Sequence, residues 1–257
     1  MKKTLILVLL CILPLLSAFS QGGERAYYQL KFYRFEDPAQ MQRLDQFFEH
    51  AYLPALHRAG IDQVGVFKPI EGKNEEKNFV IVFLPFESLA EFEDLSATLQ
   101  KDEVFQQAGR DYLDAAHDNP PYTRIESILL RAFSGFPQTG EPVQEGIKKN
   151  RVYELRSYQA STERLYERKV EMFDDGESDI FVNLGFHPLF FGEGLSSSYM
   201  PHLMYMVTCK DEASHAALWN AFREHPDWIA IKDLERYKNT VSHITSYLLY
   251  PADYSDF

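Results

Sequence analysis

Hydrophobic and polar residues alternate in short runs that predict strands, and apolar residues recur at helical spacing in longer runs that predict helices. Helical stretches begin at Asp37 and Ser88, and the first of them ends at Gly60. The polar turn at 71–76 joins two β-rich runs into a hairpin. The first half thus predicts a strand at 27–35, a helix from 37 to 60, strands at 64–69 and 79–84, helical segments between 88 and 116, and a strand at 125–133.

The second half of the chain predicts the same order of elements. They are a strand at 152–158, a helix from 161 to 184, strands at 186–191 and 203–208, a helical segment from 211 to 237, and a strand at 244–250. The first strand of each half also shares a motif, because YQLKFY at 28–33 returns as YELRSY at 153–158. The last strands echo each other at 127–130 and 246–249. Such self-similarity is typical of an internal repeat.

Each repeat is a βαββαβ unit, the order of a ferredoxin-like fold in which helices cover one face of an antiparallel sheet. The predicted fold class is α+β, with tandem ferredoxin-like βαββαβ repeats that form a dimeric α/β-barrel-like pseudo-dimer within one chain, the two sheets packing on each other. Side chains alternate between faces along a strand. We expect the apolar row of Leu30 and Leu155 under the helices, and the polar row of Lys31 and Arg156 between the sheets.

Residues 1–20 carry the pattern of an export signal. Lys2 and Lys3 precede an apolar run, and the small residues Ala18 and Ser20 stand where signal peptidase cleaves. The run is shorter than the roughly 20 apolar residues of a membrane helix. We therefore expect a secreted or periplasmic protein that is cleaved near Ser20 and Gln21. The expected organisation is a signal peptide at 1–20, a first repeat domain at 21–133, a linker rich in glycine and proline at 134–150, and a second repeat domain at 151–257.

The acidic charge of the chain bears on its partners. Its formal net charge is −12, which argues against nucleic acid, because phosphate binding depends on Lys and Arg. Cys11 lies in the export signal and Cys209 remains, so no intramolecular disulfide is expected. Cleavage of the signal would also leave no integral membrane segment. A small apolar ligand and a second copy of the chain are the partners that the sequence leaves open.

The histidines and glycines do not form a recognised metal or cofactor motif. No two histidines have the i, i+4 spacing of a helical zinc pair, so no metal site is predicted. His187, His202 and His243 are the candidates for an axial haem ligand, a role that leaves little trace in a sequence. The prediction is that no cofactor binds. The segment 192–198 matches neither a dinucleotide fingerprint nor a nucleophile elbow.

Several short motifs, taken in order, resemble the NIPSNAP family of the dimeric α/β-barrel superfamily. They are LPAL at 53–56, VGVF at 64–67 and FLPF at 83–86 in the first half, and YELRSY at 153–158, GFHPLF at 185–190, MPHLMYM at 200–206 and WNAF at 219–222 in the second. The resemblance covers nearly all of the chain after the signal, and it implies two ferredoxin-like repeats in a barrel-like pseudo-dimer. It implies no agreed reaction. The wider superfamily includes cofactor-independent monooxygenases, haem enzymes and dehydratases, and fold does not imply function.

The export signal departs from the mitochondrial and vesicle-associated members of the family, which argues against a role in intracellular trafficking. The 20 Phe and 15 Tyr residues indicate a large core and an apolar pocket. In such a pocket we expect the polar side chains Arg156, Tyr158 and His187, and the repeat adds Lys31 and Tyr33 as ligand-binding candidates. No catalytic residue is assigned.

Three functions remain open from the sequence. The first is an exported module that binds a small apolar or aromatic molecule between sheet and helices. The alternative is a cofactor-independent oxygenase or isomerase, in which a His or Tyr abstracts a proton and the pocket orients the substrate. The third is a structural or interaction module for another envelope protein. A perturbed titratable group in a closed pocket would favour the enzyme, and a large exposed apolar patch would favour the interaction module.

Overall fold

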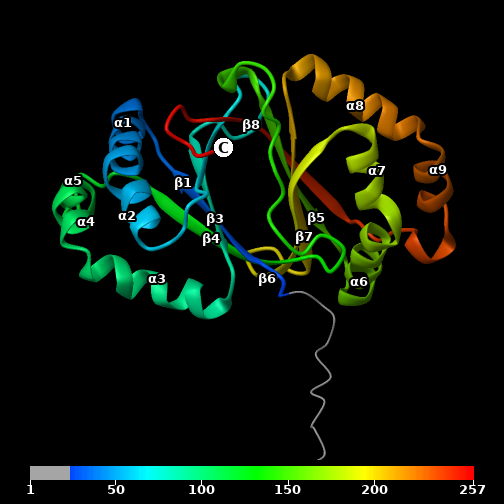
Figure 1. Ribbon diagram of the computed structural model, residues 1–257, viewed down its shortest axis with the longest axis horizontal. Helices are drawn as coiled ribbons and strands as arrows, with labels where there is room; N and C mark the ends of the chain where they lie inside the picture. Colours follow the sequence, from blue (N-terminus) through cyan, green and yellow to red (C-terminus); the bar gives the residue numbers. More distant parts are fainter. Residues whose placement is uncertain (1–23) are drawn as a thin grey trace, which may run out of the picture.

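The computed structural model describes residues 24–257, and Figure 1 shows its strands between two groups of helices. The predicted export signal at 1–20 lies outside the described residues, so export stays a prediction. Within 24–257, no helix has both the length and the apolar character that a membrane span requires.

The first half folds in the predicted βαββαβ order. Its strands are β1 (Tyr27–Arg34), β2 (Gly65–Pro69), β3 (Phe79–Phe86) and β4 (Arg124–Ala132). Its helices are α1 (Pro38–Phe47), the π-helical turn η1 (Phe48–Tyr52), α2 (Leu53–Arg58), α3 (Leu89–Lys101), α4 (Glu103–Ala108) and α5 (Arg110–Leu113). The side chains of Asp37 and Ser88 accept backbone N–H bonds at the starts of α1 and α3, which explains why these helices begin there.

The second half repeats this order. Its strands are β5 (Val152–Gln159), β6 (His187–Ser196), β7 (His202–Cys209) and β8 (His243–Pro251). Its helices are α6 (Glu163–Met172), the π-helical turn η3 (Phe173–Glu177), α7 (Ser178–Leu184), α8 (Glu212–Glu224), α9 (Pro226–Lys232) and the short η4 (Glu235–Tyr237). The segment between the halves contains the short helix η2 (Lys148–Asn150). Gly176 has a φ of +133°, a conformation that side chains with a Cβ rarely adopt, and it marks a kink within η3.

Within the described residues, the strands close into one barrel in the order β1-β3-β2-β8-β5-β7-β6-β4. The two four-stranded sheets face each other as expected, and they are also joined at both edges. Lys68 of β2 lies opposite Tyr250 of β8, and Ala132 of β4 lies opposite Gly192 of β6. Closure pairs the edge groups that each sheet alone would expose. The predicted fold class is therefore confirmed.

The interior of the barrel is filled by the apolar row of the repeated strand. Tyr28 and Leu30 of β1 pack in one buried cluster with Tyr153 and Leu155 of β5. The expectation that this row lies under the helices is wrong: it lies between the sheets, and the polar row faces the helices. An eight-stranded barrel has an interior just wide enough for side chains to fill. Charged side chains there would lose water without gaining partners, whereas the helices supply polar partners.

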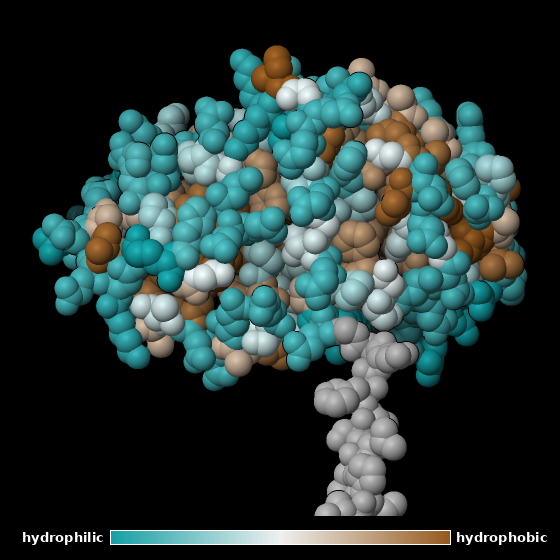
Figure 2. Space-filling model, viewed as in Figure 1, coloured by the Kyte–Doolittle hydropathy of each residue, from teal (hydrophilic) through white to brown (hydrophobic). Residues whose placement is uncertain are grey.

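Two further clusters lie outside the barrel, one under each group of helices. Tyr33 packs with Leu44 and Phe48 on the first-half side, and Tyr158 packs with Phe173 on the second-half side. Figure 1 shows α1 to α5 on one side of the barrel and α6 to α9 on the opposite side. Hydrophilic side chains cover most of the face in Figure 2, and hydrophobic ones show between them. The fold thus has three cores, and the central one is shared by both halves.

Barrel closure predicts that neither half is stable alone. Ala26 N–H donates to Pro137 O, and Gly140 N–H donates to Leu189 O, so a cut between Gln138 and Thr139 leaves each segment with its own half. Fragments 24–138 and 139–257 should aggregate or self-associate separately, because β2, β4, β6 and β8 then become open edges. Co-expressed, they should purify as one 1:1 complex by size-exclusion chromatography with light scattering. Two well-behaved separate monomers would contradict the closed barrel.

Candidate functional site

The inward-facing rows of several strands change from apolar to polar toward the same end of the barrel. The polar ends of these rows are Arg34 on β1, Glu126 on β4, Ser157 and Gln159 on β5, His202 on β7, and Thr245 and His243 on β8. Deeper in the barrel, Phe257 closes the interior by packing against Phe67 and Phe83. The inward-facing rows are therefore apolar in the body of the barrel and polar at this end.

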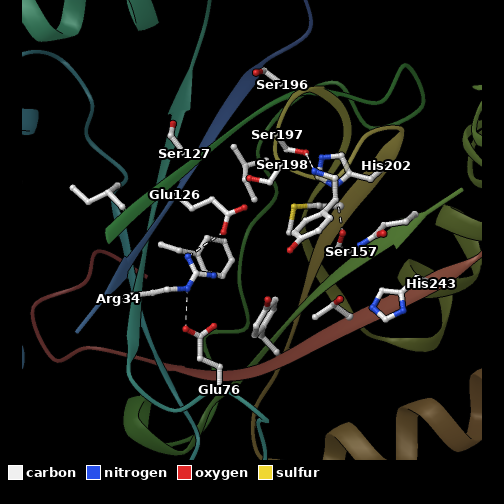
Figure 3. A pocket seen from close by; sticks show the side chains of 18 residues that line it. Arg34, Glu76, Glu126, Ser127, Ser157, Ser196, Ser197, Ser198, His202 and His243 are labelled. Atoms are coloured by element: carbon white, nitrogen blue, oxygen red, sulfur yellow. Dashed lines mark hydrogen bonds and ion pairs between the residues drawn. The ribbon is translucent and has the colours of Figure 1, made fainter. Parts of the chain in front are cut away.

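These polar side chains line a cavity of about 1030 Å³ (Figure 3). Its walls come from β1 and β4 of the first half and from β5, β6, β7 and β8 of the second. The volume reaches the upper end of the range of small-molecule pockets, about 300–1,000 Å³. Because both halves supply walls, the cavity exists only in the closed barrel.

His202 is the most deeply buried polar side chain of this cavity, with 2% of its surface exposed. Its Nδ1 lies 3.3 Å from Ser157 Oγ, and Figure 3 shows the two side chains turned toward each other. Its Nε2 is buried and has no hydrogen-bond partner among the described residues. Burial lowers the pKa of His202 to about 4, so the ring is neutral at pH 7.

Gly194 on β6 makes room for the His202 ring. A Cβ atom at position 194 would lie 2.8 Å from His202 Nε2 and 2.6 Å from the His202 carbonyl oxygen. Neither distance is compatible with an alanine unless the backbone or the ring moves. Glycine at 194 therefore allows the imidazole to lie at the junction of β6 and β7.

Arg34 lies between two carboxylates at the other wall of the cavity. Its guanidinium is 2.8 Å from Glu76 Oε1 and 3.1 Å from Glu126 Oε2, as the dashed lines in Figure 3 show. One cation thus faces two acids, which leaves this wall with an excess of negative charge. The rings of Phe32 and Tyr247 lie 5.4 Å apart and supply an aromatic surface beside it. The cavity combines hydroxyl groups, a neutral imidazole and an aromatic wall, and it disfavours anions.

The residues predicted as ligand-binding candidates lie in three other places. Lys31 and Tyr33 line a separate cavity between β1 and the first-half helices. Arg156 and Tyr158 lie together under the second-half helices, with the guanidinium 5.4 Å from the Tyr158 ring centre. His187 is exposed at the start of β6 and lines a small cavity beside Cys209, away from Arg156. The structure therefore places Lys31 with Tyr33 and Arg156 with Tyr158, and it separates His187 from both pairs.

Arg156 belongs to a buried polar cluster centred on Glu154. Glu154 forms an ion pair with Arg156 at 3.3 Å, lies 2.7 Å from His215 Nε2, and accepts a hydrogen bond from Trp219. The Trp219 ring lies over the guanidinium at 4.7 Å. Burial alone would raise the pKa of Glu154, but the His215 contact and the Arg156 charge outweigh it and hold that pKa below its usual range. Both carboxylate oxygens of Glu154 thus have partners within the cluster, which favours a structural role, while Arg156 Nε is buried without a partner among the described residues.

The barrel-end cavity was missed by the sequence interpretation, although its signal is present. On β5 the inward row runs from Leu155 to Ser157, and on β1 from Phe32 to Arg34. These changes could be seen in the sequence, but the face assignment put them on the wrong side. Among residues 24–257, no group of three or more His, Cys, Asp and Glu side chains could hold a metal ion.

Three solved structures share this architecture. A candidate monooxygenase from Fusobacterium nucleatum has a TM-score of 0.59 at 9% identity, covering 88% of this chain and 92% of its own. A candidate monooxygenase from Lactobacillus acidophilus has a TM-score of 0.57 at 8% identity, covering 89% and 94%. An anthrone oxidase-like protein has a TM-score of 0.53 at 10% identity, covering 90% and 93%. At these identities the likeness shows the fold alone.

The fold and the cavity define this chain as a tandem ferredoxin-like α/β-barrel protein with a ligand-sized cavity at one barrel end. The model of the NIPSNAP family matches residues 153–256, which confirms the resemblance over that part of the chain. The likeness of the first half to the same family stays a prediction. No curated protein sequence matches the chain significantly.

Replacement of Glu154 tests the structural role of its cluster. Glu154→Gln keeps the size of the side chain but leaves Arg156 without a counter-charge. Because Arg156 keeps some contact with solvent, we expect a loss of about 2–4 kcal/mol at pH 7, below the upper value for fully buried pairs. Arg156→Ala and Arg156→Leu should both lose stability for the reciprocal reason. Urea unfolding measures each loss, and the exposed Glu167→Gln should change little.

The same variant has a defined pH dependence. The folded-state pKa of Glu154 is lowered, so its carboxylate stabilises the fold above the unfolded value of about 4.3 and this contribution is lost as the pH falls. The stability deficit of Glu154→Gln should therefore shrink between pH 7 and pH 3.5. If Arg156→Leu instead retains full stability and removes binding of a ligand, the cluster is a binding site.

Proposed function

We propose that the chain is a small-molecule-binding protein whose main site is the barrel-end cavity. The observation that carries this proposal is the buried, unpartnered Nε2 of His202 at the cavity wall. A buried polar atom without a partner costs about 1–3 kcal/mol, and a bound ligand that supplies the partner recovers this energy. The contact with Ser157 holds the His202 ring in one orientation, and it therefore also fixes the direction of the unpartnered Nε2.

The lining indicates which ligand class fits. A hydroxyl group can both donate and accept, so it matches Nε2 in either tautomer of His202. Glu76 and Glu126 outnumber the single Arg34 cation, which disfavours an anionic ligand. The aromatic wall of Phe32 and Tyr247 suits an apolar face. The proposed ligand is a small neutral molecule that carries hydroxyl groups beside an apolar face.

The properties of His202 favour binding over catalysis. A general base acts best when its pKa lies near the working pH. With a pKa of about 4, His202 is available as a neutral base at pH 7 but is a weak one. The alternative function, a cofactor-independent oxygenase or isomerase, gains support only from a fold shared with candidate monooxygenases. Turnover of the bound molecule under air, detected by mass spectrometry, would favour that alternative.

Ligand screening tests the proposed site. The neutral probes are 4-hydroxybenzyl alcohol and glucose, and the anionic probe is benzoate. The NMR signals of the His202 ring should shift on addition of a neutral probe and should not shift with benzoate. His202→Phe should abolish the response of the remaining barrel-end signals, and the exposed His50→Phe should retain it. Affinity should not change between pH 8 and 5, because His202 titrates at about 4. Equal binding by both variants, or a midpoint near 6.5, would exclude His202 as the partner.

Native mass spectrometry and the absorption spectrum of the protein purified from its own host would identify a co-purifying molecule. A hydroxyl-bearing neutral compound that His202→Phe no longer retains is the expected finding. Co-purification of a coloured, metal-containing cofactor instead would contradict the proposed ligand class.

We further propose that the protein is exported, on the pattern at 1–20 alone. N-terminal sequencing of the protein from its native host should begin at or near Gln21. Recovery of an intact Met1 from the cytosol would overturn this part of the proposal.

A further inference from the structure

The first half contains a second, more apolar cavity outside the barrel. It measures about 600 Å³ and lies between the outer face of β1 and the helical segments α1, η1, α3, α4 and α5. Its apolar walls are formed by Phe47, Phe92, Leu95, Leu99, Phe105 and Leu113. The volume is that of a small-ligand pocket, and no part of it belongs to the barrel-end cavity.

Lys31 brings a positive charge to the floor of this cavity. Its Nζ lies 3.4 Å from the Tyr52 hydroxyl and 5.2 Å from the ring centres of Tyr33 and Tyr52. Among the described residues, no carboxylate forms an ion pair with it, although other half-buried cations such as Lys68 have one at 2.7 Å. The exposed Glu93 lies at the cavity wall without pairing to Nζ. The ammonium is therefore half-buried among aromatic rings with its charge uncompensated.

The repeat provides an internal comparison for this lysine. Lys31 corresponds to Arg156, and Gln29 corresponds to Glu154, as the shared strand motif shows. The neighbouring serine also corresponds: Gln29 Nε2 donates to Ser127 Oγ at 2.8 Å, and Ser246 Oγ donates to Glu154 at 2.7 Å. The two sites thus share these strand positions, and the carboxylate of Glu154 is one difference between them.

That carboxylate changes the space around the cation. In the second half, Glu154 neutralises the guanidinium and Trp219 covers it, so the space beside Arg156 is a small cavity of about 350 Å³. In the first half, neutral Gln29 leaves the lysine charge free, and the adjoining cavity is larger and lined by apolar side chains. In the second half the cation is paired with an acid of the chain itself. In the first half the matching cation is free to pair with the acid of a ligand.

We propose that the first-half cavity binds a small amphipathic monocarboxylate, an aromatic or medium-chain aliphatic acid. The carboxylate accepts hydrogen bonds from the Lys31 ammonium and from the Tyr52 hydroxyl, and it supplies the negative charge that Glu154 supplies to Arg156 in the second half. The apolar body lies against Phe92, Leu99 and Phe105. A single cation supports one negative charge, and Glu93 at the wall disfavours a second. This site and its ligand class are distinct from those of the barrel end.

Titration with matched probes tests the site. Phenylacetate and octanoate should bind the wild-type protein in calorimetry, and the matched alcohols 2-phenylethanol and octanol should bind about tenfold or more weakly, the scale of a lost charge-assisted hydrogen bond. Phenylmalonate, with two carboxylates, should also bind more weakly. The His202 ring signals should stay unchanged, so a failure here is distinguishable from a failure at the barrel end.

Two substitutions locate the acid. Lys31→Met removes the charge, and Gln29→Glu installs the second-half carboxylate; each should weaken phenylacetate about tenfold or more and leave 2-phenylethanol unchanged. The exposed Lys77→Met serves as the matched control and should bind like wild type. Circular dichroism and thermal melting establish that each variant is folded. Absence of acid binding to wild type at millimolar concentration, or equal acid affinity in Lys31→Met, would overturn the proposal.

If Gln29→Glu fails to fold, Gln29→Leu provides a second test of whether the free charge of Lys31 binds the acid. It lacks a charge, so it should retain acid binding while losing only the Ser127 contact. Loss of acid binding in Gln29→Leu as well would show that the amide, not the free lysine charge, is responsible, and the proposal would be wrong.

Discussion

The backbone N–H and C=O groups on the outer edges of each four-stranded sheet find partners only in the other half of the chain. β2 bonds to β8, and β4 bonds to β6, and these two seams turn two open sheets into one barrel. Open edges are unfavourable because unpaired backbone groups invite association with other chains. Closure also creates an interior that neither half has alone. The central core and the barrel-end cavity both depend on these two seams.

The interior divides into an apolar body and a polar end because water reaches it from one side. Buried rows such as Leu30 and Leu155 fill the centre, where a charged group would lack partners. At the end, Arg34 is held by two acids and His202 stays neutral, so the polar groups there are compatible with partial burial. The same alternation that builds the core thus also builds the cavity. The binding function proposed for this end follows from His202 Nε2, a buried nitrogen of the cavity wall that has no hydrogen-bond partner among residues 24–257.

The two repeats share the motif of their first strands and differ in the charge at its second position, which is Gln29 in the first half and Glu154 in the second. Glu154 satisfies Arg156 internally, and the cluster around it contributes to the stability of the second half. Gln29 at the same place leaves Lys31 uncompensated beside an apolar space. Duplication within one chain allows such a division, because the stability of the barrel rests on the shared core while one repeat retains an open site. The NIPSNAP family model matches residues 153–256, the repeat whose cluster is closed.

The order of the elements, the repeat and the fold class could be predicted from the sequence, because hydrophobic periodicity and capping residues such as Asp37 act over a few neighbouring positions. The sequence also singled out Lys31 and Arg156 as matching cations. It did not determine which face of β1 and β5 turns inward, since both faces are covered and both rows contain large side chains. Only the tertiary structure decided this, by closing the sheets around an interior too narrow to solvate charge. The sequence shows the change to polar residues at these strand ends, but it does not show the cavity at His202, because strand ends far apart in the chain meet only after the barrel closes.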